Sequence, residues 1–168
     1  MQKQAEQTFE QILEDNKGSI YRICRINAVS PVEPQDLFQE VVYHIWKSYP
    51  SFKGKSSINT WIYRIALNVC LRSKLKEEKN RGQIIQLDSI QILPAESDYN
   101  KGEEEKYRVL HSCISSLNEI DKSIIILNLE ELPYKEIAVI TGLSENHIAV
   151  KMQRIRKILL DCITPKLK

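Results

Sequence analysis

The 168-residue sequence contains only five glycines and no long run of alternating polar and apolar residues. This pattern disfavours a fold rich in β-strands. No apolar stretch approaches the roughly 20 residues that a membrane-spanning helix needs. The first ten residues are polar and acidic, unlike the basic and then hydrophobic start of a secretory signal. We therefore expect an all-α, cytoplasmic protein with no membrane insertion.

The cysteines and histidines lack the spacing of a metal site. The four cysteines lie far apart, without a Cys-x-x-Cys pair, and each has an apolar context of helical appearance. They are Cys24, Cys70, Cys113 and Cys162. We expect buried, reduced thiols, and no metal or other cofactor. The motifs described below also contain no paired carboxylates, nucleophile–base pair or phosphate-binding loop, so an enzyme is not expected.

The net charge of +2 conceals an uneven distribution along the chain. Residues 1–16 have a net charge of −3 and residues 17–81, with 12 basic and 5 acidic side chains, one of +7. Residues 82–121, with 3 basic and 8 acidic side chains, carry −5, and residues 122–168 carry +3. Two basic segments around an acidic one suggest two modules that each face a polyanion. Solvated helix faces that differ in charge explain the same pattern, and charge alone does not decide.

Apolar residues recur at helical spacing along most of the chain. The predicted helices cover residues 9–24, 35–49, 58 into the seventies, 103–117, 122–129, 134–141 and 145–160. We expect the first to be interrupted at 16–19, around Gly18, and Asp121 to cap the fifth after a turn at 118–121. The pattern fades between Lys76 and Gly102. The sequence thus predicts two small helical domains, 1–79 and 107–168, joined by a flexible acidic linker at 80–106.

Residues 132–157 have the pattern of a helix-turn-helix. Gly142 permits the left-handed turn after a short helix, and Ser144 is placed to cap the next one. One stripe of that second helix is apolar: Ile148, Met152, Ile155 and Leu159. Its other side presents Asn146, His147, Val150, Lys151 and Arg154, with Arg156 and Lys157 at the flank. Short polar groups that reach base edges and basic groups that reach phosphates suit the major groove, so we favour duplex DNA binding over a merely solvated basic face.

Three further motifs lie in the N-terminal part. They are Asp36-Leu-Phe-Gln-Glu-Val-Val-Tyr-His-Ile-Trp46, Tyr49-Pro-Ser-Phe-Lys-Gly54 and Asn59-Thr-Trp-Ile-Tyr-Arg-Ile-Ala-Leu-Asn68. The aromatic residues Phe52, Trp61 and Tyr63 are interleaved with cations, namely Lys53, Lys55, Arg64 and Arg72. Rings among cations suit a single strand, because bases stack on the rings while basic side chains follow the backbone. Trp61 shares a stripe with Ile58 and Ile65, so a core role is an equally simple interpretation for it.

Together with the helix-turn-helix, these motifs resemble bacterial RNA polymerase sigma factors of the extracytoplasmic-function (ECF) subfamily. The resemblance covers about residues 8–79 and 107–162. It implies a protein that binds core RNA polymerase, recognises the −35 and −10 promoter elements and initiates transcription without catalysing a reaction itself. It also implies an anti-sigma factor as a partner.

The resemblance assigns roles to residues by motif position. Asp36, Gln39 and Glu40 would dock on the clamp helices of the polymerase's largest subunit, although acids there also suit the helix dipole. The residues implied in binding the melted −10 strand are Phe52, Lys53, Lys55, Trp61, Tyr63, Arg64 and Asn68. The C-terminal domain would bind the −35 duplex. The base preference of relatives cannot be transferred to it, because Asn146 and His147 replace the small residues common at this turn. The alternative is a stand-alone helix-turn-helix regulator with an N-terminal dimerisation or sensing domain.

Overall fold

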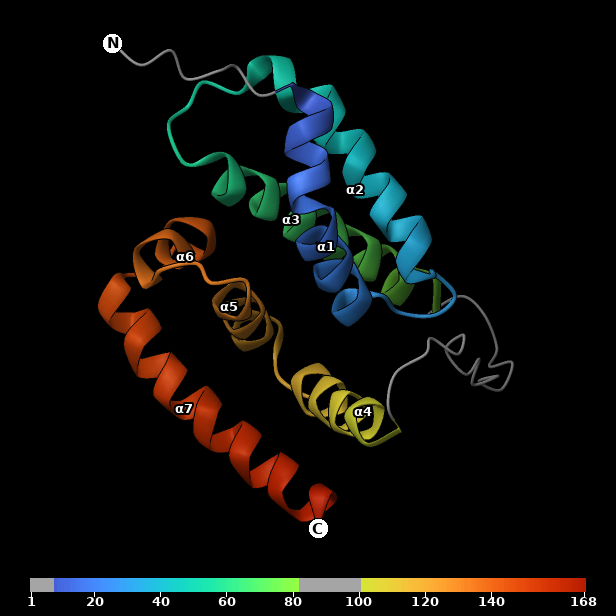
Figure 1. Ribbon diagram of the computed structural model, residues 1–168, viewed down its shortest axis with the longest axis vertical. Helices are drawn as coiled ribbons and strands as arrows, with labels where there is room; N and C mark the ends of the chain where they lie inside the picture. Colours follow the sequence, from blue (N-terminus) through green and yellow to red (C-terminus); the bar gives the residue numbers. More distant parts are fainter. Residues whose placement is uncertain (1–7, 82–100) are drawn as a thin grey trace.

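The computed structural model describes residues 8–81, here called the N-terminal half, and residues 101–168, the C-terminal half. Both are helical, which confirms the all-α prediction with a C-terminal helix-turn-helix (Figure 1). The N-terminal half contains α1 (Phe9–Asn27), α2 (Pro34–Ser48), η1 (Tyr49–Ser51) and α3 (Ile58–Arg81). The C-terminal half contains α4 (Lys101–Ser115), α5 (Glu119–Leu129), α6 (Tyr134–Thr141), α7 (Glu145–Ile163) and η2 (Thr164–Leu167). Most of the predicted linker, residues 82–100, lies outside the described residues.

The N-terminal half is a bundle in which α1, α2 and α3 pack on one another. Its core includes Ile20, Ile23, Leu37 and Ile62, all at most 1% exposed. The predicted interruption around Gly18 is wrong, because α1 runs through it without a break. A glycine inside a helix costs only about 1 kcal/mol relative to alanine. The burial of apolar residues on both sides of Gly18 outweighs that cost.

In the C-terminal half the predicted turn at 118–121 is also wrong. Asn118, not Asp121, caps α5, and its Oδ1 accepts a hydrogen bond of 2.9 Å from the Asp121 backbone N–H. Asp121 therefore lies in the first turn of the helix, where a carboxylate interacts favourably with the helix dipole. Both residues are good capping types, so the local sequence offered two starts.

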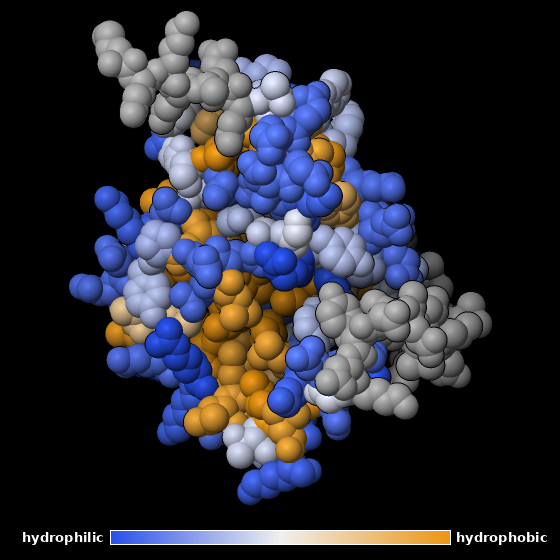
Figure 2. All heavy atoms as spheres, in the orientation of Figure 1, coloured by the Kyte–Doolittle hydropathy of each residue, from blue (hydrophilic) through white to orange (hydrophobic). Residues whose placement is uncertain are grey.

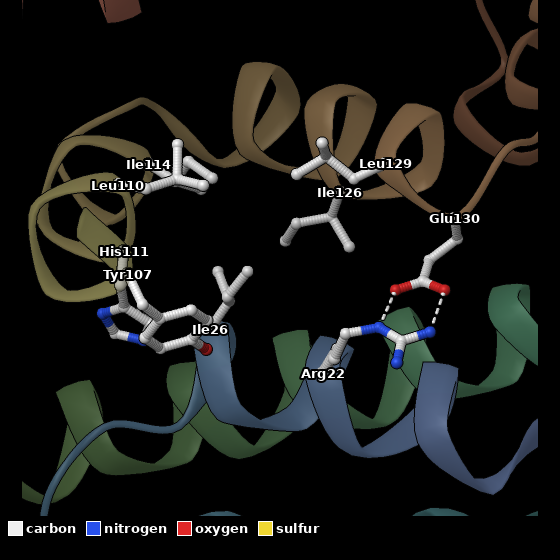
Figure 3. A pocket seen from close by; sticks show the side chains of 9 residues that line it. All are labelled: Arg22, Ile26, Tyr107, Leu110, His111, Ile114, Ile126, Leu129 and Glu130. Atoms are coloured by element: carbon white, nitrogen blue, oxygen red, sulfur yellow. Dashed lines mark hydrogen bonds and ion pairs between the residues drawn. The ribbon is translucent and has the colours of Figure 1, made fainter. Parts of the chain in front are cut away.

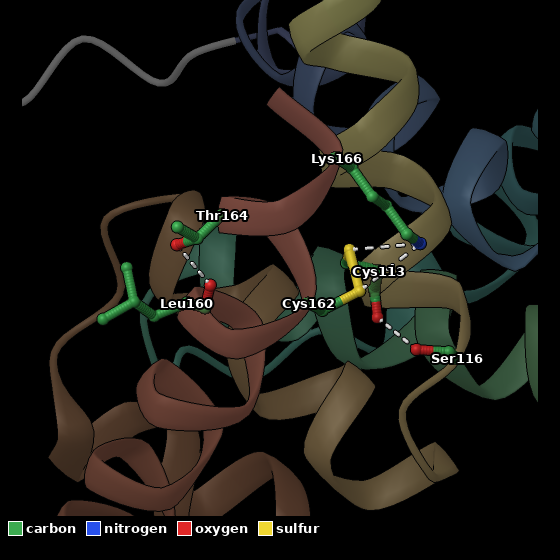
Figure 4. The surroundings of a disulfide bond; sticks show 6 residues. All are labelled: Cys113, Ser116, Leu160, Cys162, Thr164 and Lys166. Carbon is green, nitrogen blue, oxygen red and sulfur yellow. Dashed lines mark hydrogen bonds between the residues drawn. A yellow bond between two sulfur atoms is a disulfide. The ribbon is translucent and has the colours of Figure 1, made fainter. Parts of the chain in front are cut away.

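The expectation of four reduced thiols is wrong for two of them. Cys113 on α4 and Cys162 near the end of α7 form a disulfide, with 6.0 Å between their Cα atoms (Figure 4). The packing of α4 against α7 brings the two cysteines together across 49 residues of sequence. The Lys166 ammonium lies 3.8 Å from Cys113 Sγ and 3.6 Å from Cys162 Sγ.

The other two cysteines are buried and free, as expected. Cys24 lies on α1 and Cys70 on α3. A hydrogen bond with Cys24 and burial both raise the pKa of the Cys70 thiol, which keeps it protonated. Because the thiolate is the nucleophilic form, Cys70 is an unreactive core residue.

The two halves contact each other through α1 with α4 and through α3 with α6. Hydrophobic side chains gather over the lower centre of the face shown in Figure 2, where Figure 1 places α4, α5 and α7. A cavity of about 210 Å³ lies between the halves, where α1 faces α4 and α5 (Figure 3). It is lined mainly by apolar side chains, among them Ile26, Leu110 and Ile126. None of the helices in the two described ranges is long and apolar enough to span a bilayer.

Candidate nucleic-acid and polymerase interfaces

The helix-turn-helix is formed by α6 and α7. Gly142 ends α6 with a φ of 75°, the left-handed conformation that favours glycine, and Ser144 Oγ accepts a 3.1 Å hydrogen bond from the His147 backbone N–H. The predicted inward stripe is buried: Ile148, Met152, Ile155 and Leu159. This burial fixes which side of α7 faces solvent. The exposed residues of the predicted duplex-binding set are Asn146, His147, Val150, Arg154, Arg156 and Lys157.

Lys151 differs from the rest of this set. Its ammonium lies 3.0 Å from Asp121 Oδ1 on α5, and only 23% of its side chain is exposed. This ion pair partly neutralises the Lys151 ammonium, which the sequence predicts to face DNA. Sequence reasoning missed it because Asp121 lies 30 residues away and its local sequence predicts a helix cap.

The loop between η1 and α3 places an aromatic pair beside two cations. The rings of Phe52 and Trp61 have centroids 5.0 Å apart and planes inclined by 46°. Phe52 is half-buried, and it is not among the hydrophobic residues that form or flank the core, whereas Trp61 packs against that core. Lys53 and Lys55 are exposed on the same loop. Phe52 is therefore the ring whose position is least explained by packing.

Three residues of α3 have different surroundings. Tyr63 is only 5% exposed, and burial raises the pKa of its phenol. In this arrangement its ring belongs to the core and does not face a strand. Arg64 and Asn68 are exposed, but the Arg64 Nη2 donates a 3.0 Å hydrogen bond to the carbonyl of Val139 on α6. Thr60, which sequence reasoning did not single out, is 1% exposed, and its hydroxyl donates a 2.6 Å hydrogen bond to Glu136 of α6.

The predicted polymerase-binding residues Asp36, Gln39 and Glu40 are all exposed on α2. The opposite side of the helix is buried, with Leu37 and Val41 at most 1% exposed. Next to Gln39 an open apolar groove is formed by α1 and α2, and Tyr43 and Trp46 at this groove are 53% and 61% exposed. The lining residues are Phe9, Leu13, Phe38, Gln39, Val42, Tyr43 and Trp46. Exposed aromatic rings are enriched at protein interfaces, so the groove beside this acidic face is a candidate protein-binding surface.

Both halves match known families of sequence. Residues 12–80 match the Sigma-70 region 2 family, and residues 107–159 match the Sigma-70, region 4 family, in the order found in sigma factors. The chain belongs to the sigma-70 family. It is an RNA polymerase sigma factor of the ECF type, which initiates transcription through core RNA polymerase and promoter recognition and is not itself an enzyme.

Individual sigma factors are similar over most of their length. The RNA polymerase sigma factor SigV of Bacillus subtilis is 27% identical over 148 residues, which cover 86% of this chain and 84% of SigV. The ECF sigma-E factor of Escherichia coli is 26% identical over 144 residues, 79% of this chain and 75% of that protein. A solved structure of the sigma factor RpoE in complex with the anti-sigma factor NepR from Bartonella quintana has a TM-score of 0.76 at 19% identity. The alignment covers 93% of this chain and 96% of the RpoE chain, and at 19% identity the likeness supports the fold alone.

The two region matches also decide between the readings left open by the sequence. The N-terminal half matches sigma region 2, which excludes the interpretation of this half as the sensing or dimerisation domain of a stand-alone regulator.

Proposed function

We propose that this sigma factor acts through three separate surfaces, carried by a region 2 domain at 1–79 and a region 4 domain at 107–168 with 80–106 as the linker. The exposed side of α2 binds polymerase through Asp36, Gln39 and Glu40. The outward side of α7 binds the −35 duplex. The loop before α3 receives the melted −10 strand. The observation that carries the proposal is the Phe52–Trp61 ring pair flanked by the exposed cations Lys53 and Lys55, because this arrangement suits unpaired bases.

The cellular location and a further partner of the protein follow from the same proposal. Since it would work on promoter DNA with core polymerase, we place it in the cytoplasm. A partner that holds it inactive is also proposed, because the structurally similar RpoE of Bartonella quintana is in complex with an anti-sigma factor.

Capture of a base from the melted strand has to compensate for unstacking, which costs a few kcal/mol per base. Phe52 and Trp61 provide ring surface for stacking, and Lys53, Lys55 and Arg64 provide charge for the backbone. Asn68, two turns beyond Trp61 on α3, offers its side-chain amide to base edges. Tyr63 contributes from the core by holding α3 in place, since its ring is buried.

Replacing Phe52 by alanine is expected to reduce promoter opening about tenfold, since stacking on one ring contributes on the order of 1–3 kcal/mol per base. Polymerase affinity is expected to be unchanged. Permanganate reactivity of unpaired thymines measures opening, and co-purification with core polymerase measures affinity. The control is Phe52→Leu, which keeps apolar volume without a flat ring and should also open poorly. Opening at the wild-type level in the leucine variant would remove stacking from the explanation.

On α7, Arg154 is an exposed cation midway along the helix. Arg154→Ala is expected to weaken binding to −35 duplex by about tenfold, the effect of losing one good base or phosphate contact. A gel shift of the holoenzyme on duplex promoter fragments measures it. The matched control is Arg108→Ala on α4, an exposed arginine paired with Glu104, which should change little. Equal retention of both variants would contradict the role given to Arg154.

The proposed function as a whole is tested by run-off transcription. Core polymerase is supplied with genomic templates in the presence and absence of this protein. The expected result is promoter-selective RNA only when the protein is added. RNA synthesis that is identical with and without it would overturn the proposal.

A further inference from the structure

The disulfide of the C-terminal half combines a buried cysteine, a partly accessible cysteine and a nearby cation (Figure 4). Cys113 of α4 is fully buried, with an exposed fraction of 0%, whereas Cys162 near the end of α7 is half-buried. The Lys166 ammonium lies 3.6 Å from Cys162 Sγ and 3.8 Å from Cys113 Sγ. A small reagent from solvent therefore meets Cys162 before Cys113, and it meets it beside a positive charge.

Helix packing holds these three groups together. The Thr164 hydroxyl donates a 2.7 Å hydrogen bond to the Leu160 carbonyl, and η2 continues from there into contact with α4. This path carries Lys166 back over the two sulfur atoms (Figure 4). The 6.0 Å between the cysteine Cα atoms is likewise set by the packing of α4 on α7. Because the bond itself is not what places these elements, the cysteines and the ammonium remain neighbours when it is reduced.

The cation gives this pair a chemistry that the other two cysteines lack. An ammonium beside a thiol stabilises the thiolate, which is the nucleophilic form. Cys24 and Cys70 are also neighbours, but both are buried, and the raised pKa of the Cys70 thiol keeps it protonated. Proximity alone therefore does not make a reactive pair. Accessibility and a nearby cation distinguish Cys162.

The cellular location proposed above bears on what such a bond does. Thiols of the cytoplasm are kept reduced, and disulfides that form there are typically transient ones with a catalytic or redox-sensing role. The chain belongs to a family of non-enzymatic factors, which leaves redox sensing. The oxidant has to be small, since Cys162 is half-buried and its partner fully so.

We propose that Cys162 is a site of oxidation by a hydroperoxide, with Cys113 as its resolving thiol and Lys166 as the activating cation. The Cys162 thiolate attacks one peroxide oxygen, so that an S–O bond forms and the O–O bond breaks. The sulfur loses two electrons and becomes a sulfenic acid, and the leaving oxygen takes a proton and departs as water or an alcohol. The Cys113 thiol then displaces the sulfenic hydroxyl, which forms the disulfide and releases water.

A dithiol reverses the modification by thiol–disulfide exchange at Cys162, and its own two thiols end as a disulfide. Oxidation thus adds a covalent tie between α4 and the end of α7, the helix whose outward side we assign to the −35 duplex, and reduction removes it. The inference rests on the proposed function only for the cytoplasmic location and for this consequence.

The first test follows the four thiols of the full chain. The protein is reduced, freed of reductant and treated with hydrogen peroxide, without polymerase or DNA. Alkylation under denaturing conditions and mass spectrometry count and locate the remaining thiols. We expect the count to fall from four to two with Cys24 and Cys70 retained, and to return to four after dithiothreitol. Four thiols remaining under conditions that oxidise free cysteine, or oxidation of Cys24 and Cys70 at the rate of Cys162, would overturn the inference.

The second test assigns the two sulfur atoms. In Cys113→Ser the resolving thiol is absent, so the sulfenic acid of Cys162 should accumulate and be labelled by dimedone. Cys162→Ser is the matched variant, and its buried Cys113 should be labelled at least tenfold less. Both variants lack the disulfide, so an effect of its loss on stability is common to the two. Equal labelling, or stronger labelling of Cys162→Ser, would contradict the assignment.

The third test concerns the cation. Lys166→Met is expected to slow peroxide oxidation about threefold to tenfold. A unit charge about 4 Å away changes the thiolate fraction up to about tenfold, and the lower intrinsic nucleophilicity of a stabilised thiolate offsets part of this gain. Lys166→Arg keeps the charge and should react like the wild type. Lys106→Met removes the same charge from an exposed position on α4 and is the control.

An unchanged rate in Lys166→Met, or an equal loss in Lys106→Met, would overturn the role of Lys166. Faster oxidation by glutathione disulfide than by hydrogen peroxide at equal concentration would overturn the choice of oxidant. None of these measurements contains polymerase or promoter DNA. Failure of the proposed function is therefore distinguished by run-off transcription, which measures RNA synthesis and not thiol chemistry.

Discussion

Reduction of the Cys113–Cys162 disulfide is expected to lower the free energy of unfolding of the C-terminal half by about 4 kcal/mol. The bond closes a loop of 49 residues, and the chain-entropy estimate for a loop of that length gives this value. Since whole domains are stable by only about 5–15 kcal/mol, the loss is a large part of the total. The helices should nevertheless persist in the reduced protein, because the stripe from Ile148 to Leu159 remains buried.

The two halves can be followed separately in this experiment. Both tryptophans, Trp46 and Trp61, lie in the N-terminal half, so their fluorescence reports that half alone, whereas far-ultraviolet circular dichroism reports all helices. Urea unfolding with and without reductant should shift the circular-dichroism transition and change the tryptophan transition less. Cys162→Ala is the control, since its unfolding transition should match that of the reduced protein and should not change when reductant is added. Four reactive thiols in the unreduced, denatured protein, instead of two, would show that the bond does not form.

Local signals predicted the helix-turn-helix almost completely. The glycine that permits a left-handed turn, the serine cap and the apolar stripe all lie within about 20 residues, and each depends on neighbouring sequence. Gly142, Ser144 and the stripe around Met152 accordingly have the predicted conformations and burial. Two local predictions were wrong, the interruption at Gly18 and the helix start after Asp121. At both places packing selected one of two locally acceptable conformations.

The side-chain pairs between helices that sequence reasoning missed join distant segments. Lys151 pairs with Asp121, and Cys113 pairs with Cys162, although nothing in their immediate sequence indicates a partner. Tyr63 shows the same effect in the candidate site. It lies in one motif with Trp61, but α3 is packed both by α1 and by the C-terminal half, so a ring expected at the surface is enclosed. Residue type and spacing identified the candidate site, whereas the accessibility of its members depends on how the halves pack.

Reversing the charge of the α2 face, by Asp36→Lys with Glu40→Lys, is expected to weaken binding to core polymerase at least 100-fold. Both side chains are exposed, and within residues 8–81 and 101–168 the only ion pair of either is a long one, from His44 Nε2 to Glu40 Oε1 at 4.0 Å. Their charge is therefore available to a partner. A surface that is complementary to two carboxylates would face two ammonium groups instead, and like charges across an interface cost several kcal/mol. A pull-down on immobilised core polymerase, repeated over a range of salt concentrations, measures the affinity.

Two controls separate the interface from the stability of α2. Asp36 lies in the first turn, where losing a carboxylate costs about 0.3–1 kcal/mol through the helix dipole. Asp36→Asn with Glu40→Gln removes the charges without reversing them and should weaken binding by about tenfold, less than the lysine pair because no like charges are introduced. Glu14→Lys with Glu78→Lys makes the same charge change at exposed positions on α1 and α3 and should leave the affinity near that of the wild type. Equal losses in both lysine pairs would mean that the polymerase senses the overall charge of the N-terminal half, and the α2 face would lose its assigned role.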